Sequence, residues 1–135
     1  MAMEKTTKKD LYYTNDHEWI DFQGTVAYTG ICGFKLIGIK EIHQIIFNEP
    51  LGFKKKDEVI AIICYNDYKI KVHMPVDGKV LQINETILTG KRNILLQQPE
   101  TNGWIALIIP SRPYERNDLL LPKQYQMNGK SKYAK

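Results

Sequence analysis

The segment EVIAIICYNDYKIKVHMPVDGKVLQI, residues 58 to 83, contains the clearest strand patterns in this 135-residue chain. Residues 58–65 form an almost unbroken apolar run, which is typical of a strand that is largely buried. Residues 68–74 alternate lysine or histidine with apolar side chains, which indicates a strand with one solvent-exposed face and one buried face. The Asn-Asp pair between the two runs favours a tight hairpin, because both residues tolerate left-handed φ.

The rest of the chain is also rich in short runs of Val, Ile and aromatic residues. Further strands are predicted at residues 25–31, 42–47, 79–83 and 104–109. One or two helical turns are expected between residues 32 and 41. Two short helical pieces are expected within 111–126, because Pro122 interrupts any longer helix. Many short strands separated by Gly or Pro turns predict a mainly β protein, a sandwich or flattened barrel with few helices.

Composition indicates one globular domain, because 43% of the residues are hydrophobic and 25% are charged. We predict that this domain spans residues 11–127. The net charge of +4 arises partly from residues 1–10 and 128–135, which we expect to be disordered basic tails. The run Lys54–Lys56 is expected to be a solvated loop. The sequence also lacks the mixture of basic and aromatic residues that is typical of a nucleic-acid-binding surface. No nucleic-acid partner is therefore predicted.

Two further features concern location and redox chemistry. The sequence has no signal-peptide pattern and no apolar run long enough to span a bilayer, so we expect a cytoplasmic protein without a membrane partner. Cys32 and Cys64 lie in apolar strings without CxxC or metal-ligand spacing. Both are predicted to be buried, unreactive thiols.

The histidines do not form a recognisable catalytic signature. The sequence contains no nucleophile triad pattern, phosphate-binding glycine loop or HExxH motif, so neither an enzyme nor a metal site is predicted. His43 and His73 fall within strand patterns and are expected to be sheet-face residues. Asp16, His17 and Glu18 form a polar group that a turn leading into a strand explains without chemistry.

One series of motifs resembles a known family, the glycine cleavage system H protein. YTNDHEWI (13–20) resembles the family's opening Y-T-x-x-H-E-W-V string. Six more segments resemble family motifs in the same order: VAYTGI (26–31), KKDEV (55–59), MPVDGKV (74–80), INETIL (83–88), NGW (102–104) and LLLPKQY (119–125). The resemblance implies a lipoyl/biotinyl-type sandwiched hybrid barrel. It also implies a carrier, since family members bear lipoate on a hairpin-tip lysine and shuttle an aminomethyl group between partner enzymes.

The family's attachment motif, E-S-V-K-A, is replaced here by CYNDY (64–68). Counting back from Pro75 by the family spacing places the lysine position at Asp67. Counting forward from Asp57 places it at Asn66. Neither residue offers the primary amine that an amide to lipoate requires, so the chain resembles a divergent member that lacks the lipoyl-lysine.

Different functions remain open at this point. The first is a non-lipoylated module, without a cofactor, that binds a protein partner such as a glycine cleavage or lipoate-handling enzyme. The alternative is a working carrier with lipoate on Lys69, although that residue lies roughly 7 Å along the strand from Asp67. The least supported alternative is binding of a polyanion by the lysine-rich loop. The resemblance implies that Asp16, His17 and Glu18 border the groove that shelters the loaded arm, that is, the lipoyl group with its aminomethyl cargo.

Overall fold

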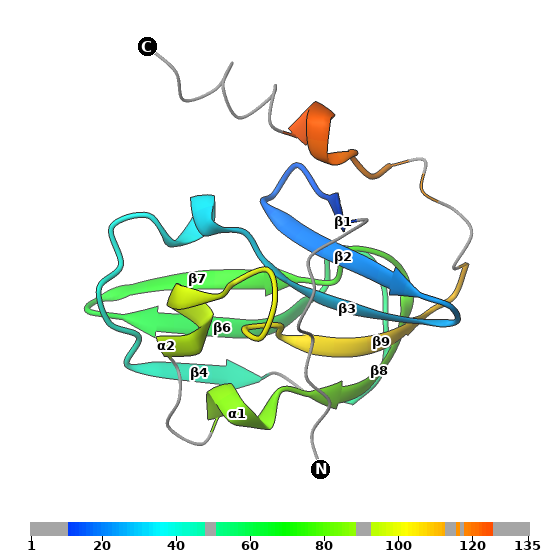
Figure 1. Ribbon diagram of the computed structural model, residues 1–135. Coiled ribbons are helices and arrows are strands. Elements are labelled where there is room, and N and C mark those ends of the chain that lie inside the picture. The colour runs from blue at the N-terminus through cyan, green and yellow to red at the C-terminus, as the bar shows by residue number, and fades with distance from the viewer. Residues whose placement is uncertain (1–10, 48–50, 89–92, 113–115, 117, 126–135) are drawn as a thin grey trace.

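The fold consists of two antiparallel sheets that enclose the main hydrophobic core. The computed structural model describes residues 11–47, 51–88, 93–112, 116 and 118–125. The larger sheet has six strands, in the order β1 (Leu11–Tyr13), β2 (Glu18–Gln23), β3 (Val26–Ile31), β9 (Ala106–Pro110), β8 (Gly78–Ile83) and β5 (Gly52–Lys54). The smaller sheet has three, in the order β4 (Gln44–Phe47), β6 (Val59–Tyr65) and β7 (Tyr68–His73). The hydrogen bonding does not close them into one continuous barrel (Figure 1).

The helices in the described residues are short and lie outside the sheets. They are the 3-10 helix η1 (Gly33–Leu36) and the α-helices α1 (Glu85–Leu88) and α2 (Asn93–Gln97). A further helical turn covers residues 122–125. It begins at Pro122, where the missing N–H of proline costs no intrahelical bond. None of the helices in this part of the chain is long and apolar enough to cross a membrane.

Alternation along the strands divides the buried side chains into two clusters on opposite faces of the six-stranded sheet. Ile20 points into the main core between the sheets, whereas its neighbour Trp19 points to the other face. The same division separates Ile108 from Leu107 on β9. The second cluster is rich in aromatic residues and includes Tyr13, whose backbone bonds to that of Leu120 near the C-terminal turn. The β2–β3–β9 part of the sheet is therefore buried on both faces.

The predicted fold class is confirmed. Strands β3, β4, β6, β7, β8 and β9 correspond to the six runs predicted from the sequence, and η1 to the predicted helical turn. Strand periodicity missed β1, β2 and β5, and no helix was predicted at α1 or α2. Of the two C-terminal pieces, one is found at 122–125, while the other falls partly on residues outside the described ranges. The predicted tails, 1–10 and 128–135, also lie outside them.

Two predictions about exposure need correction. Lys54 is not in a solvated loop, since it forms the end of β5 and is buried, although the next two lysines are exposed. Side chains alternate between the two faces of a strand, and Phe53 is exposed on the outward face. The Lys54 side chain therefore lies on the inward face of β5. Cys32 is buried as predicted, but Cys64 is only half-buried near the end of β6.

Trp19 fixes the packing of β2 against β3 and explains why β3 contains a glycine. The indole N–H of Trp19 is shared between the carbonyl oxygens of Ile31, at 3.1 Å, and Pro99, at 2.9 Å. Gly30 lies directly opposite Trp19 in the sheet register. A Cβ atom at position 30 would lie only 2.8 Å from Cζ2 of the indole, which is inside van der Waals contact. The ring therefore requires glycine at this position.

We expect Gly30→Ala to lower the free energy of unfolding by about 1–3 kcal/mol, because the fully buried indole cannot move away from the added methyl group. Urea denaturation followed by tryptophan fluorescence measures this change. Gly33→Ala is the matched control, since a Cβ there meets nothing within 4 Å. Equal stability of the Gly30 variant and the wild type would contradict this account of the Trp19 packing.

Candidate functional site

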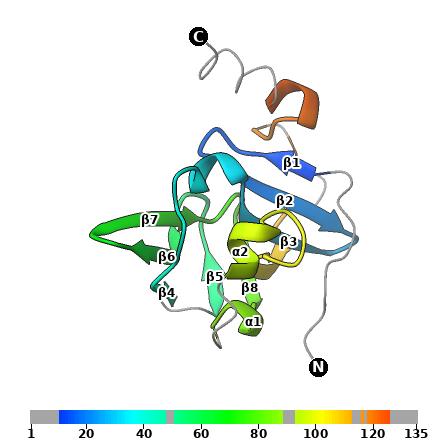
Figure 2. The ribbon, with the colours of Figure 1, turned by 60° about the vertical axis from the view of Figure 1, so that its left-hand side comes forward.

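The hairpin of β6 and β7 ends in the shortest common type of connection. Tyr65 pairs with Tyr68, so Asn66 and Asp67 alone form the turn. Asn66 has a φ of +49°, in the left-handed region that asparagine adopts more readily than most residues. Both turn residues are exposed, and the hairpin projects from the side of the molecule (Figures 1 and 2). The structure thus places both positions identified by counting at the apex.

Lys69 lies on the strand and not in the turn. It pairs with Cys64 on β6 and is exposed. It shares the outward face of β7 with Lys71, whereas Ile70 and Val72 point into the main core. Its amine is consequently presented from the side of the hairpin.

Four charged or ionisable side chains meet where the base of this hairpin approaches β2 and η1; we call Asp16, Glu18, Lys35 and His73 the charged cluster. Nδ1 of His73 lies 2.7 Å from Oδ2 of Asp16 and 2.9 Å from Oε2 of Glu18. Nζ of Lys35 lies 3.4 Å and 3.1 Å from the same two oxygens. The Glu18 side chain is only 2% exposed, so its charge depends on these partners for compensation.

The ammonium group of Lys35 has an acceptor for each of its three N–H bonds. Besides the two carboxylates, it donates to the carbonyl oxygen of Lys71 at 3.1 Å. A lysine ammonium has three donors and no acceptor, so these contacts fill its capacity. The side chain is 15% exposed. The cluster is thus a partly buried ammonium-binding site that the chain fills with its own lysine.

The charged cluster also covers the outer edge of β7. The backbone N–H of His73 donates to Oε2 of Glu18 at 2.7 Å, and the carbonyl of Lys71 accepts from Lys35. β7 is an edge strand of the three-stranded sheet, where such backbone groups otherwise face solvent. These two side chains therefore anchor the base of the hairpin to β2 and η1.

The group Asp16, Glu18 and His73 has residue types that bind metal ions, with ligand atoms within 4.8 Å of one another. Its geometry is that of a hydrogen-bonded cluster. Ligands around a tetrahedral zinc ion lie about 3.3 Å apart, given bonds of roughly 2.0–2.1 Å. The imidazole nitrogen is closer than that to both carboxylates, at 2.7 and 2.9 Å. Lys35 Nζ, in contact with both carboxylates, supplies the cation.

His17 points away from the charged cluster. Its φ is +62°, and its Nδ1 lies 2.8 Å from the hydroxyl of Tyr125. Its ring also packs against Phe34 of η1, with centroids 5.7 Å apart. The Asp16, His17 and Glu18 group therefore divides: the two acids face β7, and the histidine faces the C-terminal turn.

Sequence reasoning missed two members of the charged cluster. His73 was interpreted as a sheet-face residue, and Lys35 was only part of a predicted helical turn. The alternation of polar and apolar residues in β7 predicts that His73 lies on the solvent-facing side of the strand. Nothing in the sequence relates it to Asp16 and Glu18, which lie 55 or more positions earlier. Only the packing of η1 and β7 against the start of β2 brings them together.

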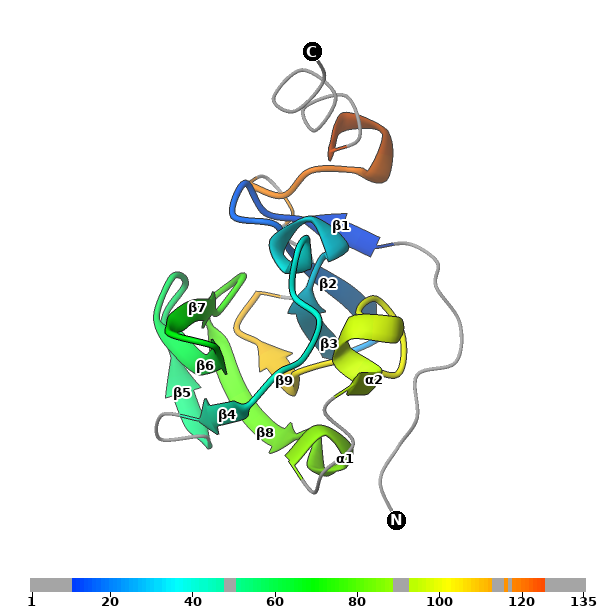
Figure 3. The ribbon, with the colours of Figure 1, turned by 90° about the vertical axis from the view of Figure 1, so that its left-hand side faces the viewer.

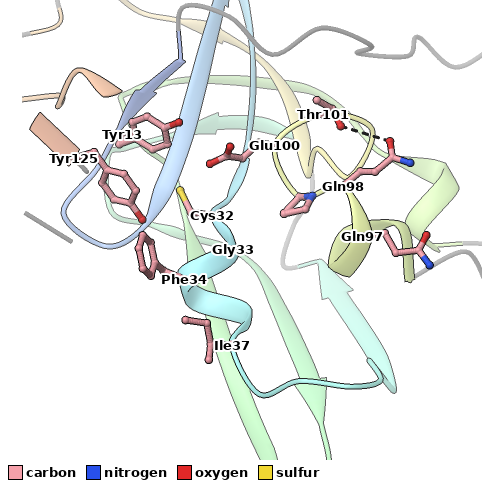
Figure 4. A pocket seen from close by; sticks show the side chains of 11 residues that line it. Tyr13, Cys32, Gly33, Phe34, Ile37, Gln97, Gln98, Glu100, Thr101 and Tyr125 are labelled. Atoms are coloured by element: carbon pink, nitrogen blue, oxygen red, sulfur yellow. Dashed lines mark hydrogen bonds between the residues drawn. The ribbon is translucent and has the colours of Figure 1, made fainter. Parts of the chain in front are cut away.

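A second feature is an open pocket of about 620 Å³ beside η1 (Figure 4). Tyr13, Phe34 and Tyr125 line one side, and Gln97 and Gln98 the other. The rings of Tyr13 and Tyr125 stack at 4.2 Å, with an angle of 9° between their planes.

Burial raises the pKa of three side chains that line this pocket. It raises the pKa of the Cys32 thiol to about 12 and is also the main reason that the pKa of Tyr125 is raised. The pKa of Tyr13 is raised by burial first and then by the negative charge of Glu100. At neutral pH the thiol and both phenols are therefore protonated, and none of the three is an ionised nucleophile.

Comparison with known proteins gives a consistent result. The family model described as "Glycine cleavage H-protein" matches residues 11–132. The chain is 30% identical over 118 residues to a "Probable glycine cleavage system H protein" of Aeropyrum pernix, covering 87% of this chain and 82% of the relative. It is 28% identical over 118 residues to the "Glycine cleavage system H protein" of Endomicrobium trichonymphae, covering 87% and 94%.

The fold is similar to that of a solved structure as well. A glycine cleavage system H protein from Mycobacterium marinum superposes with a TM-score of 0.75, covering 91% of this chain and 99% of that one. Sequence identity between the two is 21%, so this likeness concerns the fold.

We expect Lys35→Met to lower the free energy of unfolding by about 1.5–3 kcal/mol, since it removes charged hydrogen bonds from the buried Glu18 carboxylate while keeping an unbranched side chain. Chemical denaturation measures the change. Lys56→Met is the control, because its pair with Asp118 is exposed, at 3.8 Å, and such pairs contribute little. Equal losses in the two variants would contradict the assigned role of Lys35.

Proposed function

The chain belongs to the glycine cleavage H-protein family, and from this premise we propose that it is a non-lipoylated member that acts by binding a protein partner. The family consists of carrier proteins of the glycine cleavage system, which are not catalysts themselves. The proposed partner is an enzyme of that system or one that handles lipoate. In this role the domain supplies a recognition surface and transfers no aminomethyl group.

The observation that carries the proposal is the chemistry of the hairpin apex. Lipoate is attached by an amide bond, which needs a primary amine on a protruding turn. The turn here consists of Asn66 and Asp67, whose side chains are an amide and a carboxylate. Neither is an amine nucleophile. The family's hairpin is thus retained without the group that the modification requires.

The charged cluster supports the same proposal. By the family resemblance, Asp16 and Glu18 border the groove that shelters a loaded arm. In this chain both carboxylates already bind Lys35 and His73. An arriving amine would have to displace the Lys35 ammonium from three acceptors. The acidic residues therefore have a structural role that does not depend on a bound arm.

The alternative, lipoylation of Lys69, has one observation in its favour. Lys69 is an exposed primary amine on the same hairpin, immediately after the pair that closes the turn. Its position argues against it, because the backbone at Lys69 is paired with Cys64 and its side chain leaves the strand laterally. An enzyme that grips a protruding turn would meet Asn66 and Asp67 first.

Co-expression with an active lipoate ligase in lipoate-supplemented medium separates the two functions by intact mass. We expect the wild-type chain to remain unmodified, because the apex lacks an amine. The matched variant Asp67→Lys, which installs an amine at the apex, is expected to gain the mass of one lipoyl group. An H protein that carries lipoate, expressed in parallel, verifies the ligase.

A mass increase in the wild type that disappears in Lys69→Arg would contradict the proposal and establish the carrier alternative. The variant Asp67→Lys also contains Lys69, so a fragment spectrum must assign the modified residue. Modification at position 67 alone supports the view that the hairpin is otherwise suited to lipoylation and lacks only the amine at its apex.

A further inference from the structure

We propose that the stacked pair Tyr65 and Tyr68, at the tip of the β6–β7 hairpin, is the anchor of an interface with a protein partner that has an apolar cleft with an acidic rim. This inference rests on the proposed function and assigns the surface through which it operates. It replaces a covalent arm at the tip with a rigid aromatic contact.

The two tyrosines form a defined and accessible unit. They are directly opposite each other in the register, and their ring centroids lie 5.7 Å apart with an angle of 29° between the planes. The Tyr68 side chain is 66% exposed. A cross-strand pair of this kind restricts both rings, so binding costs little additional side-chain entropy. Tyrosine is also among the residues that most often dominate binding energy at interfaces.

Strand alternation explains why aromatic rings are exposed here. Tyr65 shares its face of β6 with Ala61 and Ile63, and Tyr68 shares its face of β7 with Val72. Those three inner residues belong to the main core. The two tyrosines continue the same face to the end of the hairpin, which projects from the sandwich in Figure 2 and is viewed from its tip in Figure 3. The core-facing side of the hairpin thus ends in an accessible aromatic surface.

The base of the hairpin is held in place, which makes its tip suitable for rigid docking. Glu18 binds the backbone of His73, and Lys35 binds the backbone of Lys71. Both contacts join β7 to other elements of the fold. The hairpin is therefore preorganised, and its tip presents a fixed surface to a partner.

Charge specifies the chemistry of the partner. Lys69 and Lys71 are exposed on the outward face of β7, which is opposite to the face that bears the tyrosine pair. Asp67 at the apex offsets one of these two positive charges, so the tip carries a net positive charge. A cleft that receives the hairpin tip contacts both of its faces, so an apolar wall against the tyrosines and acidic rim residues opposite the lysines are complementary to it.

The test measures binding of the full chain to each purified glycine cleavage enzyme and to the lipoate ligase of the same cell, by isothermal titration calorimetry. We expect at least one protein to bind, and the double variant Tyr65→Ser, Tyr68→Ser to bind it at least about tenfold more weakly, a loss of about 1.4 kcal/mol. Lys69→Glu is expected to weaken binding most at low salt, because rim charges are screened as salt increases.

Two control variants match the tip in exposure and residue type. Phe53→Ser removes an aromatic side chain that is 59% exposed on β5 of the other sheet, and Lys79→Glu reverses an exposed charge on β8. Both controls should bind as the wild type does. Circular dichroism and amide spectra verify that every variant is folded.

The outcomes distinguish this inference from the proposed function. Equal affinity of the double variant and the wild type would overturn the anchor while leaving a partner-binding function in place. Absence of binding to every tested protein would overturn both. Self-association of the wild type that is lost in the double variant would show that a second copy occupies the tip, which also overturns the proposed partner.

Discussion

The functional end of this molecule depends on the hydrogen bonds of the Glu18 carboxylate. It is almost completely buried, and it accepts hydrogen bonds from Lys35 on η1 and from both the ring and the backbone of His73 on β7. A buried charge is tolerated only when such partners replace its lost hydration. Together with Asp16, which contacts the same two partners, this side chain holds the start of β2, the 3-10 helix and the base of the hairpin in a fixed relation.

The same carboxylate connects the architecture with the proposed function. The chain belongs to the family and has its fold, and the apex of its projecting hairpin consists of Asn66 and Asp67. Near the base of that hairpin, the chain's own ammonium group occupies the acidic site. The absent amine and the filled acidic site are separate features, since no described hydrogen bond joins the apex to the charged cluster. Both support a domain that binds a partner without a swinging arm.

Much of the fold was predictable from the sequence because local patterns decide it. The alternation in residues 68–74 and the apolar run before it predict β7 and β6, and the Asn-Asp turn between them is where the counting places the apex. β1 and β5 were missed because three residues are too few to show a period. A strand was expected after the polar turn at residues 16–18, where β2 lies, but Glu18 was assigned to the turn, whereas it is the first residue of the strand and is buried through tertiary contacts.

The charged cluster shows where sequence reasoning ends. Asp16 and Glu18 were identified by the family resemblance, whereas Lys35 and His73 were not associated with them. Their partnership arises from the packing of η1 and β7 against β2, and neither residue belongs to a local pattern that indicates an ion pair. His17 was grouped with its neighbours in sequence, but its positive φ turns it toward Tyr125.

The central claim is that the hairpin carries no lipoyl group in its natural setting. The most direct test is the intact mass of the protein purified from its own cells, followed by fragmentation of the peptide that contains residues 64–75. This account predicts that every lysine of that peptide is unmodified. A lipoyl group found on Lys69 or Lys71 in a substantial fraction of the native protein would contradict it.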